Sequence, residues 1–264
     1  MRSAQLLGRG HLEEGRIACV GEANVAIAIS RGGAKKRYSH KEPNEDAVCF
    51  AHGAAGTLLA VADGHAGAEA SELAMRILLE DAALHWTRNG VERERWGEAA
   101  EALVTAVHTA IIAAGMRHDS HARTTLSIAY VQPEEGFCGW ISAGDSHIFA
   151  IGARHDELGP AEGRPRFLGS PRNDLSALGL RTGCCELPAL RAIVLATDGL
   201  SERGIGVADP LDAAARAVGS ASQHPATRQP LEAARGLAEQ AIAAQQRQRA
   251  GDNVCTAVCW LADA

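Results

Sequence analysis

Short apolar segments bounded by turn residues recur along the chain and predict strands. The clearest are two almost uninterrupted apolar runs, 57–62 and 192–197, each followed directly by an Asp-Gly pair. The segment Pro-Glu-Glu-Gly at 133–136 has the length and composition of a hairpin loop between two further apolar runs. Together these patterns predict strands at 24–30, 47–51, 57–62, 124–131, 137–142, 146–152, 192–197 and 254–261.

Other segments have the spacing of helices. From 68 to 84 the apolar residues Leu73, Ile77 and Leu84 recur at intervals of four and seven, which is typical of one helix face. Further helices are predicted at 92–114, 210–218 and 231–248. Because strands occur in hairpin-like pairs and helices in separate pairs, the order favours an α+β fold with antiparallel sheets. The Gly-, Pro- and Arg-rich stretch 153–188 is expected to be a loop or a small subdomain.

Composition and charge exclude several classes of protein. The 264 residues are 46% hydrophobic and 22% charged, an ordinary globular mixture. A net charge of −6 without a basic cluster argues against nucleic acid as a partner. We expect no membrane span, because we find no apolar run near the roughly 18–20 residues required. The first 14 residues have no hydrophobic signal region, so a cytoplasmic location is expected.

The seven cysteines are odd in number, lie mostly in predicted strands and lack Cys-x-x-Cys spacing. These features suit reduced core thiols better than a disulfide framework.

Aspartates stand at the ends of several predicted strands. Asp63 and Asp198 each follow an apolar strand and precede a glycine, while Asp252 precedes Asn253 and the last strand. Asp145 lies between two strands, and Asp46 opens the strand at 47–51. Any one of these aspartates is explained by a turn. Five carboxylates at the ends of core strands, however, are suitable oxygen ligands for Mg²⁺ or Mn²⁺, which would offset their mutual repulsion.

These residues resemble the motifs of a known family, the metal-dependent phosphatases of the protein phosphatase 2C type. The matching stretches occur in the family's order and extend from about residue 25 to residue 261. They are Asn-Glu-Asp at 44–46, Val-Ala-Asp-Gly-His-Ala-Gly at 61–67, Thr-Thr-Leu at 124–126, Ala-Gly-Asp-Ser-His at 143–147, Ala-Thr-Asp-Gly-Leu at 196–200 and Gly-Asp-Asn at 251–253.

The resemblance implies a four-layer αββα sandwich of two antiparallel sheets flanked by helix pairs. It would occupy residues 24–264 as one catalytic domain, with 1–23 as an N-terminal lead segment. The implied activity is hydrolysis of phosphoserine and phosphothreonine in proteins, without a phosphoenzyme, by a water that two bound metal ions activate.

The family's metal ligands correspond to particular positions of this chain. Asp63 would bridge two metals and Gly64 would offer its carbonyl to one of them. Two or three Mn²⁺ or Mg²⁺ ions are implied. Asp198 and Asp252 would bind the first metal, Asp46 would bind the second with support from Glu45, and Asp145 would bind a third.

Two residues are implied to act on the substrate. His65 corresponds to the general acid that would protonate the leaving serine oxygen, which as an alkoxide is a strong base. Lys41 stands where better-known family members have an arginine that grips the substrate phosphate. A lysine supplies the charge without the planar two-donor fork of arginine.

The sequence also departs from the family pattern. Glu202 replaces an aspartate near the third metal, and His147 replaces the arginine that usually follows the Asp-Ser pair. The flap region is shortened, although 171–174 and 177–179 still resemble its end.

Two alternatives remain open on the same fold: a metal phosphohydrolase for small phosphate esters, and a catalytically silent binding module. The favoured interpretation is a monomeric protein phosphatase whose partner is a phosphorylated protein, either a serine/threonine kinase or its target.

Overall fold

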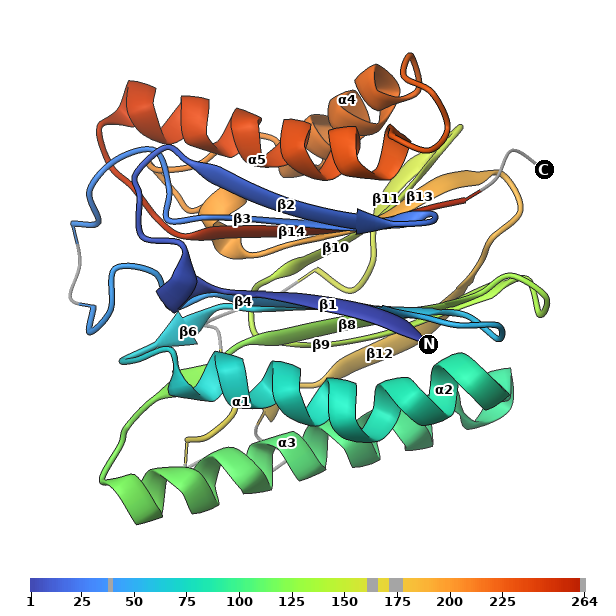
Figure 1. Ribbon diagram of the computed structural model, residues 1–264, viewed down its shortest axis with the longest axis horizontal. Coiled ribbons are helices and arrows are strands. Elements are labelled where there is room, and N and C mark those ends of the chain that lie inside the picture. The colour runs from blue at the N-terminus through green and yellow to red at the C-terminus, as the bar shows by residue number, and fades with distance from the viewer. Residues whose placement is uncertain (38–39, 161–165, 171–177, 262–264) are drawn as a thin grey trace.

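The structure is a computed structural model that describes residues 1–37, 40–160, 166–170 and 178–261. Its strands form two six-stranded antiparallel sheets that stack face to face, with helices covering both outer faces (Figure 1). The predicted α+β class and the four-layer αββα sandwich are therefore confirmed.

Each sheet is assembled from strands far apart in the sequence. The first sheet has the order β1 (Arg2–Leu7), β4 (Ala47–His52), β5 (Thr57–Ala62), β8 (Leu126–Gln132), β9 (Phe137–Ala143) and β12 (Arg181–Glu186). The second has the order β11 (His155–Glu157), β10 (His147–Gly152), β13 (Leu190–Ala196), β14 (Val254–Trp260), β3 (Val25–Ser30) and β2 (Ile17–Glu22). A two-stranded ladder of β6 (Gly64–His65) and β7 (Arg123–Thr124) lies beside them.

The apolar strands are buried on both faces, and alternate side chains enter different cores. In β5, Leu59 and Val61 join the cluster between the two sheets. Leu58, Ala60 and Ala62 join the cluster between the first sheet and its helices. This two-residue alternation explains why the strand is apolar at every position rather than at every second one.

Helices cover the outer face of each sheet. The first sheet packs against α1 (Glu69–Ile77), α2 (Ala83–Asn89) and α3 (Trp96–His118), and the second against α4 (Pro210–Ala221) and α5 (Gln229–Gln248). A π-helical turn, η2 (Leu78–Ala82), joins α1 to α2, so the single helix predicted at 68–84 is interrupted. The predicted starts and ends of α4 and α5 lie within three residues of those observed.

The N-terminal residues form part of both sheets, which the sequence analysis did not predict. Within the expected lead segment 1–23, β1 pairs with β4 at the edge of one sheet and β2 pairs with β3 at the edge of the other. Strands β11 and β12 were likewise missed inside the stretch expected to be a loop. Much of the predicted shortened flap, at 161–165 and 171–177, lies outside the described residues.

One helical segment bears on the expectation that the chain has no membrane span. Residues Arg93–His118 are long and apolar enough to cross a bilayer by length and composition, with a mean hydropathy of 1.5 over 18 residues. Core helices of soluble proteins pass the same test. In this fold Val104 and Val107 are buried in the cluster between α3 and the first sheet.

All seven cysteines are free thiols, as predicted. Cys49, Cys138, Cys255 and Cys259 are buried in strands, and Cys184 is exposed in β12.

Candidate metal centre

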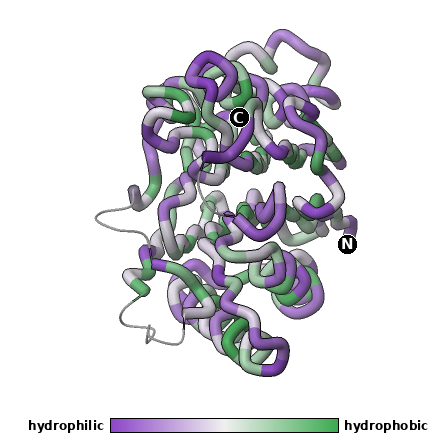
Figure 2. Tube along the Cα trace, turned by 90° about the vertical axis from the view of Figure 1, so that its left-hand side faces the viewer, coloured by the Kyte–Doolittle hydropathy of each residue, from purple (hydrophilic) through white to green (hydrophobic). Residues whose placement is uncertain are grey.

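The predicted metal ligands meet at one end of the sandwich because the strands that carry them are neighbours. Asp46 precedes β4 and Asp63 follows β5, and these two strands pair with Ala47 opposite Ala62. Asp198 follows β13 and Asp252 precedes β14, which also pair with each other. β6, which begins directly after Asp63, marks this end of the molecule at the left of Figure 1. Figure 2 views the same end directly, where hydrophilic loops make up much of the periphery.

Three aspartates come together closely. Asp63, Asp145 and Asp198 each offer one carboxylate oxygen, and these oxygens lie within 4.8 Å of one another. Asp145 belongs to the connection between β9 and β10, which carries the chain from the first sheet to the second. The cluster thus combines residues from both sheets.

Two carboxylate oxygens of the site are buried without a hydrogen-bond partner among the described residues: Oδ1 of Asp46 and Oδ1 of Asp145. The other oxygen of Asp46 accepts a hydrogen bond from the Thr197 hydroxyl at 2.8 Å. A buried acceptor without a donor is costly, because its lost hydration is not replaced. Bound cations would satisfy these oxygens.

The electrostatics of the site have the same implication. Burial, followed by repulsion from Asp63, raises the pKa of both Asp46 and Asp198 well above the usual range. The same two causes, in the same order, raise the pKa of Asp145. Burial and mutual repulsion therefore oppose the ionised form of these carboxylates, and positive charge nearby would favour it.

Lys36 supplies some of this charge, and the sequence analysis missed it. Its ammonium lies 3.5 Å from Oδ1 of Asp252, and both side chains are buried. A parallel bridge between Lys36 and Gly251 holds the two segments side by side. One lysine cannot balance five carboxylates, so the site keeps an excess of negative charge. An all-oxygen, negatively charged donor set fits Mg²⁺ or Mn²⁺.

Glycines allow the metal-centre loops to pack closely. A side-chain carbon at Gly64 would meet the carbonyl oxygen of Glu45 at 2.1 Å, and one at Gly199 would meet that of Asn253 at 1.7 Å. Both distances are far shorter than real contacts. The glycines after Asp63 and Asp198 are therefore needed because a side chain there would collide with a second chain segment.

Hydroxyl groups next to the aspartates hold the backbone of the site. Thr125 accepts a hydrogen bond from the Asp63 amide at 3.0 Å, and Thr124 donates one to the Asp63 carbonyl at 2.7 Å. Arg181, from the unpredicted strand β12, donates to the carbonyl of Gly144 beside Asp145.

His65 is in direct contact with the cluster. Its Nε2 lies 2.8 Å from Oδ2 of Asp63, and its ring packs against Phe167 with centroids 4.3 Å apart. Burial alone would lower the pKa of His65, but the hydrogen bond to Asp63 and the charge of that residue outweigh it, so the pKa is raised. The side chain stays 34% exposed, which leaves a face open to an incoming molecule.

Lys41 has a different environment. Its ammonium forms an ion pair with Glu69 of α1 at 2.8 Å and is more than half exposed. Glu45, four residues on, accepts hydrogen bonds from the amides of Lys41 and Glu42. Glu45 therefore holds the loop before β4 through its Oε1 atom.

Two residues that depart from the family pattern, His147 and Glu202, lie among the described residues. His147 bridges Glu157 and Ser201 through its two ring nitrogens, each at 2.6 Å. The ring thereby ties β10 to β11 and to the turn after Asp198. Glu202 lies near enough for its charge to contribute to the raised pKa of Asp145.

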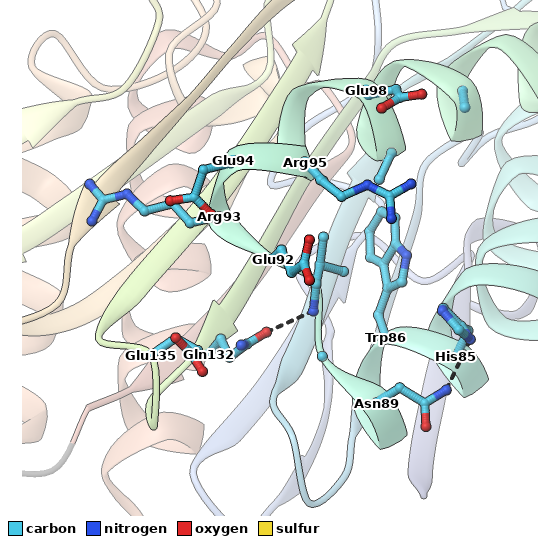
Figure 3. Close-up of a pocket in the computed structure, with 14 residues that line it drawn as sticks. His85, Trp86, Asn89, Glu92, Arg93, Glu94, Arg95, Glu98, Gln132 and Glu135 are labelled. Atoms are coloured by element: carbon cyan, nitrogen blue, oxygen red, sulfur yellow. Dashed lines mark hydrogen bonds between the residues drawn. The ribbon is translucent and has the colours of Figure 1, made fainter.

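A separate pocket of about 760 Å³ lies where α2 meets the start of α3 (Figure 3). Charged side chains of both signs surround it, and the Val91 amide donates to Gln132 at 2.9 Å on its wall. None of the predicted site residues lines this pocket. It is therefore distinct from the metal centre.

Comparison with solved structures relates the fold to known phosphatases. Serine-threonine phosphatase 2C from Toxoplasma gondii superimposes with a TM-score of 0.64 at 15% identity, covering 98% of this chain and 99% of the other. Serine/threonine phosphatase Stp1 from Staphylococcus aureus gives 0.64 at 15% identity, covering 95% and 98%. The catalytic domain of the phosphatase PstP, in complex with two manganese ions, gives 0.60 at 23% identity, covering 92% and 98%.

A search of curated proteins finds no match to this chain. The sequence pattern of the family described as "Protein phosphatase 2C", however, matches residues 33–239, which is most of the chain. Together with the acidic cluster, this match shows that the chain belongs to the protein phosphatase 2C family, the metal-dependent serine/threonine phosphatases.

Proposed function

We propose that this phosphatase hydrolyses phosphoserine and phosphothreonine in protein substrates at the centre built around Asp63. The observation that carries the proposal is the cluster of three carboxylates within 4.8 Å, accompanied by two buried carboxylate oxygens without a donor among the described residues. Two or three Mn²⁺ or Mg²⁺ ions would occupy the centre. Their proposed ligands are Asp46, Asp63, the carbonyl of Gly64, Asp145, Asp198 and Asp252.

When bound, the cations supply a nucleophile from water near neutral pH and stabilise the negative charge of the phosphate. The chain's own residues supply the geometry. Asp63 is held by two threonines and is shared between His65 and the cluster. Thr197 holds one oxygen of Asp46, while the other oxygen has no hydrogen-bond partner among the described residues and would be free to bind a cation.

His65 is proposed to donate the proton to the leaving oxygen of the substrate. Its contact with Asp63 orients the ring at the edge of the centre and outweighs burial in raising the pKa of the ring, which favours the protonated form that a general acid needs. Lys41 is proposed to assist by attracting the phosphate, although its pair with Glu69 must then loosen or be shared.

The decisive experiment measures release of phosphate from three matched peptides carrying phosphoserine, phosphothreonine or phosphotyrosine, and from small phosphate monoesters. Each assay is run with Mn²⁺ and with a chelator. We expect metal-dependent turnover of the first two peptides. Full activity in chelator would exclude the metal centre. Turnover of small esters alone would favour the metabolite phosphohydrolase, and no turnover of any substrate would favour the silent binding module.

A further inference from the structure

Arg123 stands directly opposite His65. The β6–β7 ladder pairs these two residues, while Gly64 pairs with Thr124. Side chains of opposed residues in an antiparallel ladder extend from the same face. The structure therefore joins an arginine to the proposed general acid, although 58 positions separate them in the sequence.

Phe167 packs against both side chains. Its ring centroid lies 4.3 Å from that of His65 and 4.9 Å from the guanidinium carbon of Arg123. A guanidinium that packs its face on an aromatic ring keeps the N–H groups at its edge available, and the packing reduces the entropy lost on binding.

The charge of Arg123 is available to a ligand. Among the described residues Arg123 forms no ion pair, in contrast to Lys41, whose ammonium is paired with Glu69. Arg123 is also exposed to solvent. A fixed, accessible guanidinium beside the site is suited to binding a carboxylate or a phosphate group.

A pocket of about 530 Å³ extends from Arg123 along the end of α3. Ile112 and Met116 provide apolar walls, and Met116 is 77% exposed. Among the described residues that line the pocket, Asp119 is the single carboxylate. The pocket can therefore receive an extended peptide whose anionic group lies at Arg123.

We propose that Arg123 binds an acidic side chain adjacent to the phosphorylated residue of the substrate protein, and so gives the enzyme a preference for acidic phosphorylation sites. This inference rests on the proposed function. Because His65 would protonate the leaving oxygen of the substrate, the residues beside His65 face the peptide chain that carries this oxygen. Phe167 orients the arginine, and the pocket along α3 accommodates the chain beyond it.

The test uses two phosphoserine peptides that differ only in the residues flanking the phosphoserine, glutamate in one and lysine in the other. With Mn²⁺ present, the wild-type enzyme should show a kcat/KM about fivefold higher for the glutamate peptide, the range of a solvent-accessible ion pair. Arg123→Ala should abolish this preference, and Arg123→Glu should reverse it. Each comparison is made within one variant, so the fraction of active protein cancels.

p-Nitrophenyl phosphate, which has no flanking side chain, separates the acidic neighbour from the transferred phosphate. Its turnover should be unchanged in both variants. A parallel loss on this ester would show that Arg123 grips the transferred phosphate, and an unchanged peptide preference in Arg123→Glu would remove Arg123 from recognition. Either result overturns the proposal. Arg88→Glu, an exposed arginine on α2, is the matched control and should leave the preference intact.

A binding measurement keeps this inference separate from the proposed function. Fluorescence anisotropy with the same two labelled peptides on metal-free protein reports affinity without turnover. If the enzyme hydrolyses nothing, the proposed function fails. The role of Arg123 is still supported if wild type binds the glutamate peptide more tightly than the lysine peptide and the two Arg123 variants do not. Equal affinities of wild type for both peptides would contradict it.

Discussion

Asp63 is held at both its side chain and its backbone, since its carboxylate meets His65 and its backbone is held by two threonines. We expect Asp63→Asn, Asp198→Asn and Asp252→Asn each to lower kcat at least about 100-fold, because each removes charge that would hold the cations. Asp81→Asn, at an exposed position in the helical layer, is the control.

Thermal unfolding distinguishes this result from loss of the fold. Burial and repulsion destabilise the ionised form of Asp198, so the metal-free Asp198→Asn protein should melt no lower than metal-free wild type. Wild-type turnover in any two of the three variants would refute the metal centre.

His65 permits a sharper test, because a general acid matters most for a poor leaving group. Nitrophenolate leaves unaided and a serine alkoxide does not. His65→Ala should therefore lose at least about tenfold more activity on a phosphoserine peptide than on p-nitrophenyl phosphate. Equal losses on the two substrates, or weaker Mn²⁺ binding by calorimetry, would make His65 a support for Asp63 instead.

At the residue scale, the sequence was sufficient to predict that the aspartates lie at the ends of apolar strands, and insufficient to predict which residues surround them. Each aspartate follows or precedes an apolar strand, and that pattern can be recognised in the sequence alone. Lys36 lies in a run with Lys35 and Arg37, and the sequence does not show which of the three is buried. In the structure Lys36 is buried, and it forms a bridge with Gly251. The contact between Arg123 and Phe167 likewise depends on tertiary structure.

At the element scale, buried strands were predictable and edge strands were not. β5 and β13 are apolar at nearly every position because both of their faces are covered. β1 and β12 lie at opposite edges of the first sheet, carry polar residues and resemble loops when taken alone. Their existence depends on pairing with β4 and β9, which no local pattern encodes.

The junction of β4, β5 and β6 gives a prediction about backbone packing. Gly64→Ala would push a methyl group against the Glu45 carbonyl, 2.1 Å away, and displace either Asp46 or Asp63. We expect loss of Mn²⁺ binding by calorimetry and destabilisation of about 1–3 kcal/mol. Gly219→Ala on α4, where nothing lies within 4 Å, should be neutral or stabilising by up to about 1 kcal/mol. Equal effects of the two substitutions would contradict this account.

For the whole molecule, the raised pKa values of Asp46, Asp145 and Asp198 predict how stability depends on pH. A carboxyl whose pKa is higher in the folded than in the unfolded state makes the folded state bind more protons. Its contribution is fully present below the unfolded pKa and is lost as pH rises through the folded one. The Tm of metal-free protein should therefore fall as pH rises above the unfolded aspartate pKa of about 4.

Saturating Mn²⁺ should raise the Tm at pH 8 and flatten this dependence, since the cations neutralise the same carboxylates. For a chain of this length each kcal/mol corresponds to about 2–4 °C in Tm. Differential scanning calorimetry in chelator and in Mn²⁺ measures both effects. A Tm that rises with pH in chelator would contradict the electrostatic description of the site.

The aspartates come from both halves of the sandwich: Asp46 and Asp63 flank strands of the first sheet, and Asp198 and Asp252 flank strands of the second. A bound ion is therefore also a crosslink between the two sheets, in addition to the apolar layer that lies between them. Such coupling is reciprocal. Loosening that layer, for instance at Phe50, must weaken ion binding by the same free energy with which the ion tightens the layer.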